Sequence, residues 1–179
     1  MKSQKHKFEI PFVGLKLGKH SFEYEINDAF FEVRDYSPIT SGDLKVNLIL
    51  EKKETMMIAE FTAHGFVKVL CDRCNTPMDL LVDSALRIIY KTGTEESEDE
   101  TLVVIPPEAY QIDVSDPIYE MIMVGIPARP IHKEGQCDAE MLETMKQYVV
   151  NSDDEEYDDE SDEEDDYIDP RWEILRNKN

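Results

Sequence analysis

The sequence lacks an apolar run long enough to cross a membrane. A membrane-spanning helix needs about 20 consecutive apolar residues, and no stretch of this chain approaches that length. The basic residues 1–7 are also not followed by the uninterrupted hydrophobic region of a secretory signal peptide. We therefore expect a cytoplasmic protein that does not act at a membrane.

Short motifs that carry catalysis are lacking as well. The chain contains seven glycines but no glycine-rich phosphate loop, no nucleophile elbow and no paired-histidine signature of a metalloprotease. Its densest groups of carboxylates lie in charged runs, where burial does not tune their pKa values. We therefore expect that the protein is not an enzyme.

Positive charge is scarce. The chain has 19 lysines and arginines against 40 aspartates and glutamates, for a net charge of −21. Most of the excess comes from residues 153–160 and 162–166, which contain no base. Such a chain is a poor ligand for naked nucleic acid, because Lys and Arg contacts to phosphate dominate that affinity. Either the acidic run is only a solvating tail, or it attracts basic partners such as ribosomal proteins.

Alternation of apolar and polar residues predicts four strands. Residues 22–26 and 44–50 follow a period of two, and residues 56–70 keep their odd positions apolar across Gly65. That third run is either one long strand or two segments with a bulge at the glycine. Residues 80–90 alternate again and form the fourth strand.

Weaker patterns fill the remaining chain. Residues 27–35 suggest a helical turn, and residues 102–105 and 110–114 suggest short strands. Two amphipathic helices are then predicted at about 116–125 and 138–149, capped by Asp116 and Asp138 and packed on the sheet.

These elements predict an α+β fold: a mainly antiparallel, curved sheet formed by residues 7–114, with two packed helices.

We assign residues 1–150 to a single domain and residues 151–169 to a disordered acidic linker, since that run buries too little apolar surface to offset chain entropy. Residues 170–179 form a short terminal helix motif. Its candidate partner-binding residues are Arg171, Trp172 and Leu175, which bind either a partner or the chain's own domain.

The three cysteines are too few for a disulfide framework. Cys71 and Cys74 form a CxxC motif at a connection between strands, and His132 and Cys137 occur together far downstream. Two thiolates on a turn plus a Cys or His pair from a second segment make up a structural zinc site. The four residues are therefore candidate ligands of zinc, in a module that zinc stabilises; alternatively, none of them binds a metal.

A thiol oxidoreductase is the competing interpretation of the CxxC motif. Arg73 favours a thiolate next to it. However, redox CxxC motifs usually open a helix after a strand, and Pro77 and the following alternation predict a strand here.

Several segments together resemble the YceD family, the large ribosomal RNA subunit accumulation proteins of bacteria. The resemblance rests on an ordered set of motifs: Gly65-Phe66-Val67-Lys68-Val69-Leu70-Cys71-Asp72-Arg73-Cys74, then Ile112-Asp113 and Asp116-Pro117-Ile118-Tyr119-Glu120, then Pro127-Ala128-Arg129-Pro130-Ile131-His132 with Cys137, and finally Asp169-Pro170-Arg171-Trp172 with Leu175.

The resemblance implies a ribosome-biogenesis factor without catalytic activity. Such a factor supports the synthesis, processing or stability of large-subunit ribosomal RNA, and its partners would be ribosomal or assembly proteins and ribonucleoprotein precursors. Whether RNA is contacted directly stays open. Many members of the family carry a second CxxC where this chain has His132 and Cys137. Either the histidine has replaced a ligand or the metal site has been lost.

Overall fold

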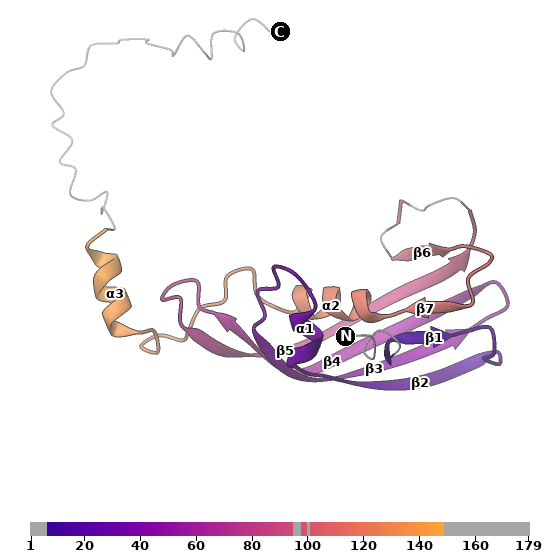
Figure 1. Cartoon of the computed structure of the whole chain (residues 1–179), viewed down its shortest axis with the longest axis horizontal. Coiled ribbons are helices and arrows are strands. Elements are labelled where there is room, and N and C mark those ends of the chain that lie inside the picture. The colour runs from indigo at the N-terminus through magenta and orange to yellow at the C-terminus, as the bar shows by residue number, and fades with distance from the viewer. Residues whose placement is uncertain (1–6, 95–97, 100, 149–179) are drawn as a thin grey trace, which may run out of the picture. The chain divides into compact units, whose positions relative to one another are not determined.

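The computed structural model describes residues 7–94, 98–99 and 101–148 (Figure 1). The chain divides into two units, residues 1–142 and 143–179, and the second is described only over residues 143–148. The predicted linker at 151–169 and the terminal motif with Arg171, Trp172 and Leu175 lie outside the described residues.

The first unit is built on a five-stranded sheet (Figure 1). Its strands, in spatial order, are β2 (Gly18–Ile26), β3 (Ser41–Lys52), β4 (Met56–Leu70), β5 (Pro77–Thr92) and β6 (Leu102–Ile105). Neighbouring strands pair antiparallel except β5 and β6, which are parallel. The α+β class and the mainly antiparallel sheet are thus confirmed.

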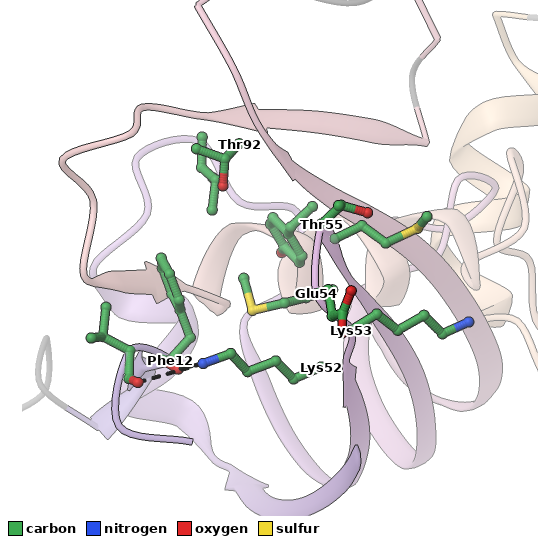
Figure 2. Close-up of a pocket in the computed structure, with 11 residues that line it drawn as sticks. Phe12, Lys52, Lys53, Glu54, Thr55 and Thr92 are labelled. Carbon is green, nitrogen blue, oxygen red and sulfur yellow. Dashed lines mark hydrogen bonds between the residues drawn. The ribbon is translucent and has the colours of Figure 1, made fainter. Parts of the chain in front are cut away.

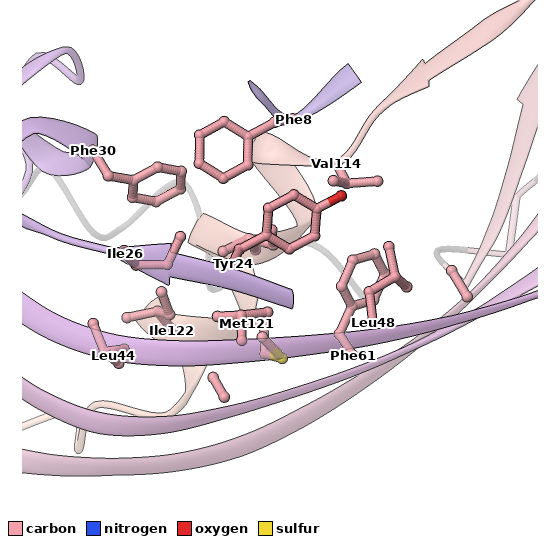
Figure 3. Packing of buried hydrophobic residues seen from close by; sticks show 14 of the residues in the cluster. Phe8, Tyr24, Ile26, Phe30, Leu44, Leu48, Phe61, Val114, Met121 and Ile122 are labelled. Atoms are coloured by element: carbon pink, nitrogen blue, oxygen red, sulfur yellow. The ribbon is translucent and has the colours of Figure 1, made fainter. Parts of the chain in front are cut away.

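The inward face of the sheet carries the core. Alternate residues of β3 are at most 1% exposed, namely Leu44, Val46, Leu48 and Leu50, as the period-two pattern predicts. Phe8, Phe30 and Tyr24 form contacts between aromatic rings above these strands (Figure 3). Burial of this apolar surface is the main force that holds the layers together.

Two short helices and a second sheet cover the core. Helix α1 (Asp28–Glu32) buries Phe30 and Phe31 against β3, and α2 (Ser115–Val124) packs on β4 and β5. Strands β1 (Glu9–Pro11) and β7 (Gln111–Asp113) pair antiparallel. The β1–β7 pairing joins segments that are far apart in the sequence.

Gly65 lies in the interior of β4, and the strand passes through it without a bulge. The register with β3 and with β5 runs unbroken through the pairs Leu44↔Gly65 and Gly65↔Val82. A Cβ at this position would come within 2.6 Å of the Cα of Leu44, which is closer than side chains tolerate. Glycine therefore permits a close approach of β3 to β4.

Helix α2 begins two residues earlier than predicted. Its N-cap is Val114, so the prediction that Asp116 caps it is wrong. The Asp113 carboxylate accepts the Ser115 N–H at 2.8 Å, while the Asp116 carboxylate instead accepts from the Arg34 guanidinium at 2.9 Å. The predicted packing of this helix on the sheet is confirmed, because Ile118, Met121 and Ile122 are buried and α2 contacts β4 and β5.

Helix α3 (Ala139–Lys146) begins as predicted, since the Asp138 carboxylate accepts the N–H of Met141 at 2.8 Å. It ends earlier than the predicted residue 149. None of its residues is buried, so the prediction of a second helix packed on the sheet is not confirmed. No helix among the described residues is long and apolar enough to cross a membrane.

Candidate metal centre

The CxxC motif occupies the tip of the β4–β5 hairpin. The two strands pair to their ends at Leu70↔Pro77, and the turn between them is closed by the Cys71 N–H, which donates to the Thr76 carbonyl at 2.9 Å. Asn75 takes a left-handed conformation with φ of 54°, which Asn adopts more readily than most residues. The prediction of a strand-to-strand connection is confirmed.

A second segment returns to this tip after α2. The N–H of Asp72 donates to the carbonyl of Pro130 at 2.8 Å, joining two backbones across the sequence. The N–H of His132 also points at the Cys71 sulfur, at 3.4 Å. These contacts place the loop that carries His132 and Cys137 directly against the hairpin tip.

All four predicted ligands meet in one cluster. The ligand atoms of Cys71, Cys74, His132 and Cys137 lie within 4.8 Å of one another. The Cys74 sulfur is 3.4 Å from Nδ1 of His132. Both hairpin cysteines are buried, at 1% and 0% exposed, whereas His132 and Cys137 are half-buried.

The cluster fits zinc in donor type and spacing. Three sulfurs and one imidazole are a common set for structural zinc, and a tetrahedron with Zn–S bonds of about 2.3 Å places neighbouring sulfurs about 3.8 Å apart. Four protein ligands would leave no open position for water or substrate, so a zinc ion held here would be structural. It would clamp the His132 loop to the hairpin.

The environment of the hairpin cysteines favours thiolates, the form that binds a metal. The Thr76 hydroxyl, 3.1 Å from the sulfur, is the main cause that lowers the pKa of Cys74 to about 5. Burial opposes ionisation of Cys71, but hydrogen bonds from the backbone N–H groups of His132, Cys74 and Arg73 lower its pKa below the usual value. In metal sites, hydrogen bonds from neighbouring groups to the ligands also hold those ligands in place.

The pKa values of the other two candidate ligands are both raised. Hydrogen bonds to Cys71 and Cys74 raise the pKa of His132, and burial with the neighbouring thiols raises the pKa of Cys137. Both shifts favour the protonated forms, so binding of a metal ion by these two residues would release protons.

Sequence reasoning missed two contributors to this region. Thr76 lies two residues after Cys74. This position in the turn is the sequence feature from which its contact with Cys74 could have been predicted. The carbonyl of Pro130 had no signal, because a backbone contact leaves no trace in residue type.

A pocket of about 210 Å³ lies at the other end of β4, away from the cysteines (Figure 2). Phe12, Lys52 and Met57 line it among other residues. The Lys52 ammonium donates to the carbonyls of Phe12 and Leu15 at 2.8 and 2.9 Å, so this lysine holds the loop after β1. The hydroxyl of Tyr90, another lining residue, is buried and has no hydrogen-bond partner within the described part of the chain.

One comparison with known proteins gives a match. Residues 59–177 match the family model of the large ribosomal RNA subunit accumulation protein YceD. The matched range contains the tip and nearly all of the β4–β5 hairpin, α2, the loop with His132 and Cys137, and the acidic run. Neither the curated proteins nor the solved structures yield a match.

Proposed function

Since the chain belongs to the YceD family of large ribosomal RNA subunit accumulation proteins, we propose that it is a non-enzymatic bacterial factor in the accumulation of large-subunit ribosomal RNA. It supports the synthesis, processing or stability of that RNA by binding ribosomal or assembly proteins and ribonucleoprotein precursors in the cytoplasm. The family match over residues 59–177 is the observation that carries this proposal.

The charge of the chain supports protein partners over naked RNA. The acidic runs at 153–160 and 162–166 repel phosphate and attract the lysines and arginines of ribosomal proteins. Partners that carry such surfaces are abundant on particles in assembly. The chain would then act through an interaction and needs no catalytic group.

Zinc is the proposed cofactor, held by Cys71, Cys74, His132 and Cys137. The ion would fix the loop that follows α2 onto the β4–β5 hairpin and so give the interaction module one stable shape. Histidine would then take the place of one cysteine of a four-cysteine site.

A thiol oxidoreductase is the weaker alternative. It is favoured by the lowered pKa of Cys74, but both hairpin sulfurs are buried, and a redox cysteine must be reached by another disulfide. A Cys71→Ser/Cys74→Ser variant that loses a disulfide-exchange activity of the parent would favour this alternative.

Affinity purification from gently lysed cells, with and without nuclease, tests the proposal. We expect the tagged chain to retain proteins of the large subunit after nuclease treatment. Loss of those proteins on nuclease treatment would indicate RNA-dependent association. Absence of the chain from all precursor particles at low salt would refute the proposed function.

A further inference from the structure

The edge of the five-stranded sheet beside β5 is only partly paired. Strand β6 pairs with residues 89–92 alone, although β5 begins at Pro77. Residues 77–88 therefore have β4 on one side and, within the described part of the chain, no strand on the other. The proposed function has given this edge no role.

A row of backbone donors and acceptors follows this edge. In an antiparallel pair, alternate residues of a strand point both the N–H and the C=O at the same neighbour. The N–H of Ile89 donates to the carbonyl of Thr101 at 2.8 Å, away from β4, so every second residue before Ile89 also points these groups away from β4. No backbone hydrogen bond between described residues reaches the groups in question, which belong to Asp79, Leu81, Asp83, Ala85 and Arg87.

The exposed side chains of the edge combine acidic and apolar groups. The side chains of Asp79 and Asp83 are 70% and 81% exposed, and Leu81 between them is 53% exposed. Leu81 lies opposite Phe66 of β4, which is 55% exposed. The outer face of the edge therefore offers an apolar pair flanked by two carboxylates.

Both carboxylates are paired only loosely. Lys68 lies 3.7 Å from Asp79, and His64 lies 3.9 Å from Asp83, in both cases from the β4 side. Exposed pairs of this kind contribute little to stability. The two carboxylates are therefore available to cations that approach from the open side of β5.

From this arrangement we propose that an extended basic segment of a partner protein adds to the sheet as a strand along residues 79–87. The proposal rests on the proposed function and names the form in which a basic partner is bound. The backbone of the segment pairs with the row of N–H and C=O groups, as in other complexes formed by strand addition. On the outer face, Lys or Arg lies beside Asp79 and Asp83, and an apolar residue extends the pair of Leu81 and Phe66.

A second copy of the chain fits this edge less well. Antiparallel pairing of two copies about Asp83 would place the two Asp83 carboxylates beside each other, and like charges directly opposite destabilise a sheet. The net charge of −21 also repels two copies. A basic segment avoids both penalties, and the carboxylates of the edge attract it.

The test uses the isotope-labelled full chain and a synthetic peptide with the central sequence Lys-Thr-Val-Thr-Lys. Alternate residues of an extended peptide share one face, so its valine and lysines match Leu81 and the two aspartates. One comparison peptide carries glutamate in place of both lysines. A second carries methyl groups on its backbone nitrogens, which removes the donors and keeps the side chains.

We expect the parent to bind the basic peptide at least about tenfold more tightly than either comparison peptide, because like charges and lost backbone hydrogen bonds each oppose strand addition. Amide hydrogen exchange locates the bound peptide. The N–H groups of Leu81 and Asp83 should exchange at least about tenfold more slowly in the complex, since hydrogen-bonded amides exchange only on local opening. The N–H groups of β2, at the other edge of the sheet, should not change.

Two variants alter the edge itself. Leu81→Pro removes one outward N–H and no hydrogen bond to β4, a position where a strand tolerates proline, and should weaken peptide binding about tenfold. Asp79→Asn/Asp83→Asn should weaken it about fivefold at low salt and less at high salt.

The matched control is Glu23→Gln/Glu25→Gln, which removes two exposed carboxylates from the edge strand β2. This control should stay within about twofold of the parent, as expected for surface substitutions away from the site. Circular dichroism and metal content establish that each variant keeps the fold.

The failures are distinguishable. Equal binding of the peptide by the parent and Leu81→Pro, or no binding by the parent, overturns strand addition; if the parent still retains large-subunit proteins, the proposed function stands. Slow exchange at Leu81 and Asp83 in the free parent means that this chain or a second copy already covers the edge, which also overturns the proposal. A parent that binds neither the peptide nor any large-subunit protein or precursor particle overturns both proposals.

Discussion

The sulfur of Cys74 lies 3.4 Å from Nδ1 of His132, although the two residues are 58 positions apart in the sequence. This contact joins the β4–β5 hairpin to the loop that follows α2. A metal site depends on this contact, because one metal ion can bind both atoms only if the two segments meet.

We predict that the purified protein binds one equivalent of zinc and that chelation destabilises it. Zinc at about 1,000 times its Kd adds about 4 kcal/mol, which for a chain of this size corresponds to about 10 °C in Tm. Metal analysis and thermal unfolding with and without chelator check this.

Cys74→Ser should abolish stoichiometric zinc and the effect of chelator, whereas His64→Ala should change neither. His64 is a suitable control, because it lies on the exposed face of β4, 3.9 Å from the exposed Asp83 carboxylate, and does not belong to the metal cluster. A parent protein with no zinc, and with a Tm that chelator does not change, contradicts the metal site.

A second prediction concerns the pH dependence of the metal-free protein. The pKa of Cys74 falls from 9.0 to about 5 on folding. A lowered pKa adds stability that is present in full above pH 9 and is lost as the pH falls towards 5. The pKa of His132 is raised from 6.5, so its contribution is present below pH 6.5 and is lost as the pH rises through the folded value.

Because the two contributions have opposite signs, the comparison is made between the metal-free parent and metal-free Cys74→Ser. The free energy of unfolding of the parent, relative to the variant, should decrease as the pH is lowered from 9 to 5. Denaturant unfolding at several pH values measures it. If the difference in the free energy of unfolding between the parent and the variant is constant over this range, Cys74 is not a thiolate in the folded protein.

Gly65→Ala should destabilise the protein by more than about 2 kcal/mol, which is typical when a buried contact is overpacked. The new Cβ would meet the backbone of Leu44, and the two neighbouring strands hold that backbone in place. Gly14→Ala is the control, since its Cβ would have no atom within 4 Å. Equal denaturation midpoints for the two variants would contradict the close approach.

Arg34→Lys should cost about 1–2 kcal/mol although it keeps the charge. The guanidinium lies 4.5 and 4.6 Å from the ring centroids of Phe30 and Tyr119 and also pairs with Asp116, and an ammonium does not stack in the same way. Arg87→Lys, in an exposed pair with Glu60 at 4.0 Å, should change stability by less than about 0.5 kcal/mol. Chemical denaturation of both variants compares them.

The strands whose residues alternate between apolar and polar could be predicted from the sequence. Apolar alternation located β2, β3, β4 and β5, and hence placed Cys71 and Cys74 on a hairpin. The residue types of His132 and Cys137 then sufficed to predict the cluster, because few other side chains could complete a site with two thiolates.

Contacts between distant backbones could not be predicted in this way. The pairing of β1 with β7 involves three residues on each strand, too few for a period to be recognised. Asp116 looked like a helix cap because Pro117 follows it, but its carboxylate pairs with Arg34, which no local pattern reveals. The apolar spacing in α3 predicted packing on the sheet, whereas none of the residues of α3 is buried.

The most direct measurement for the whole account is the ratio of large-subunit to small-subunit ribosomal RNA in cells that lack this chain. We expect the ratio to fall and large-subunit precursors to change in amount. The parent gene should restore the ratio, and a Cys74→Ser gene should restore it less well than His64→Ala. An unchanged ratio, with unchanged precursor and mature large-subunit RNA, would contradict the account.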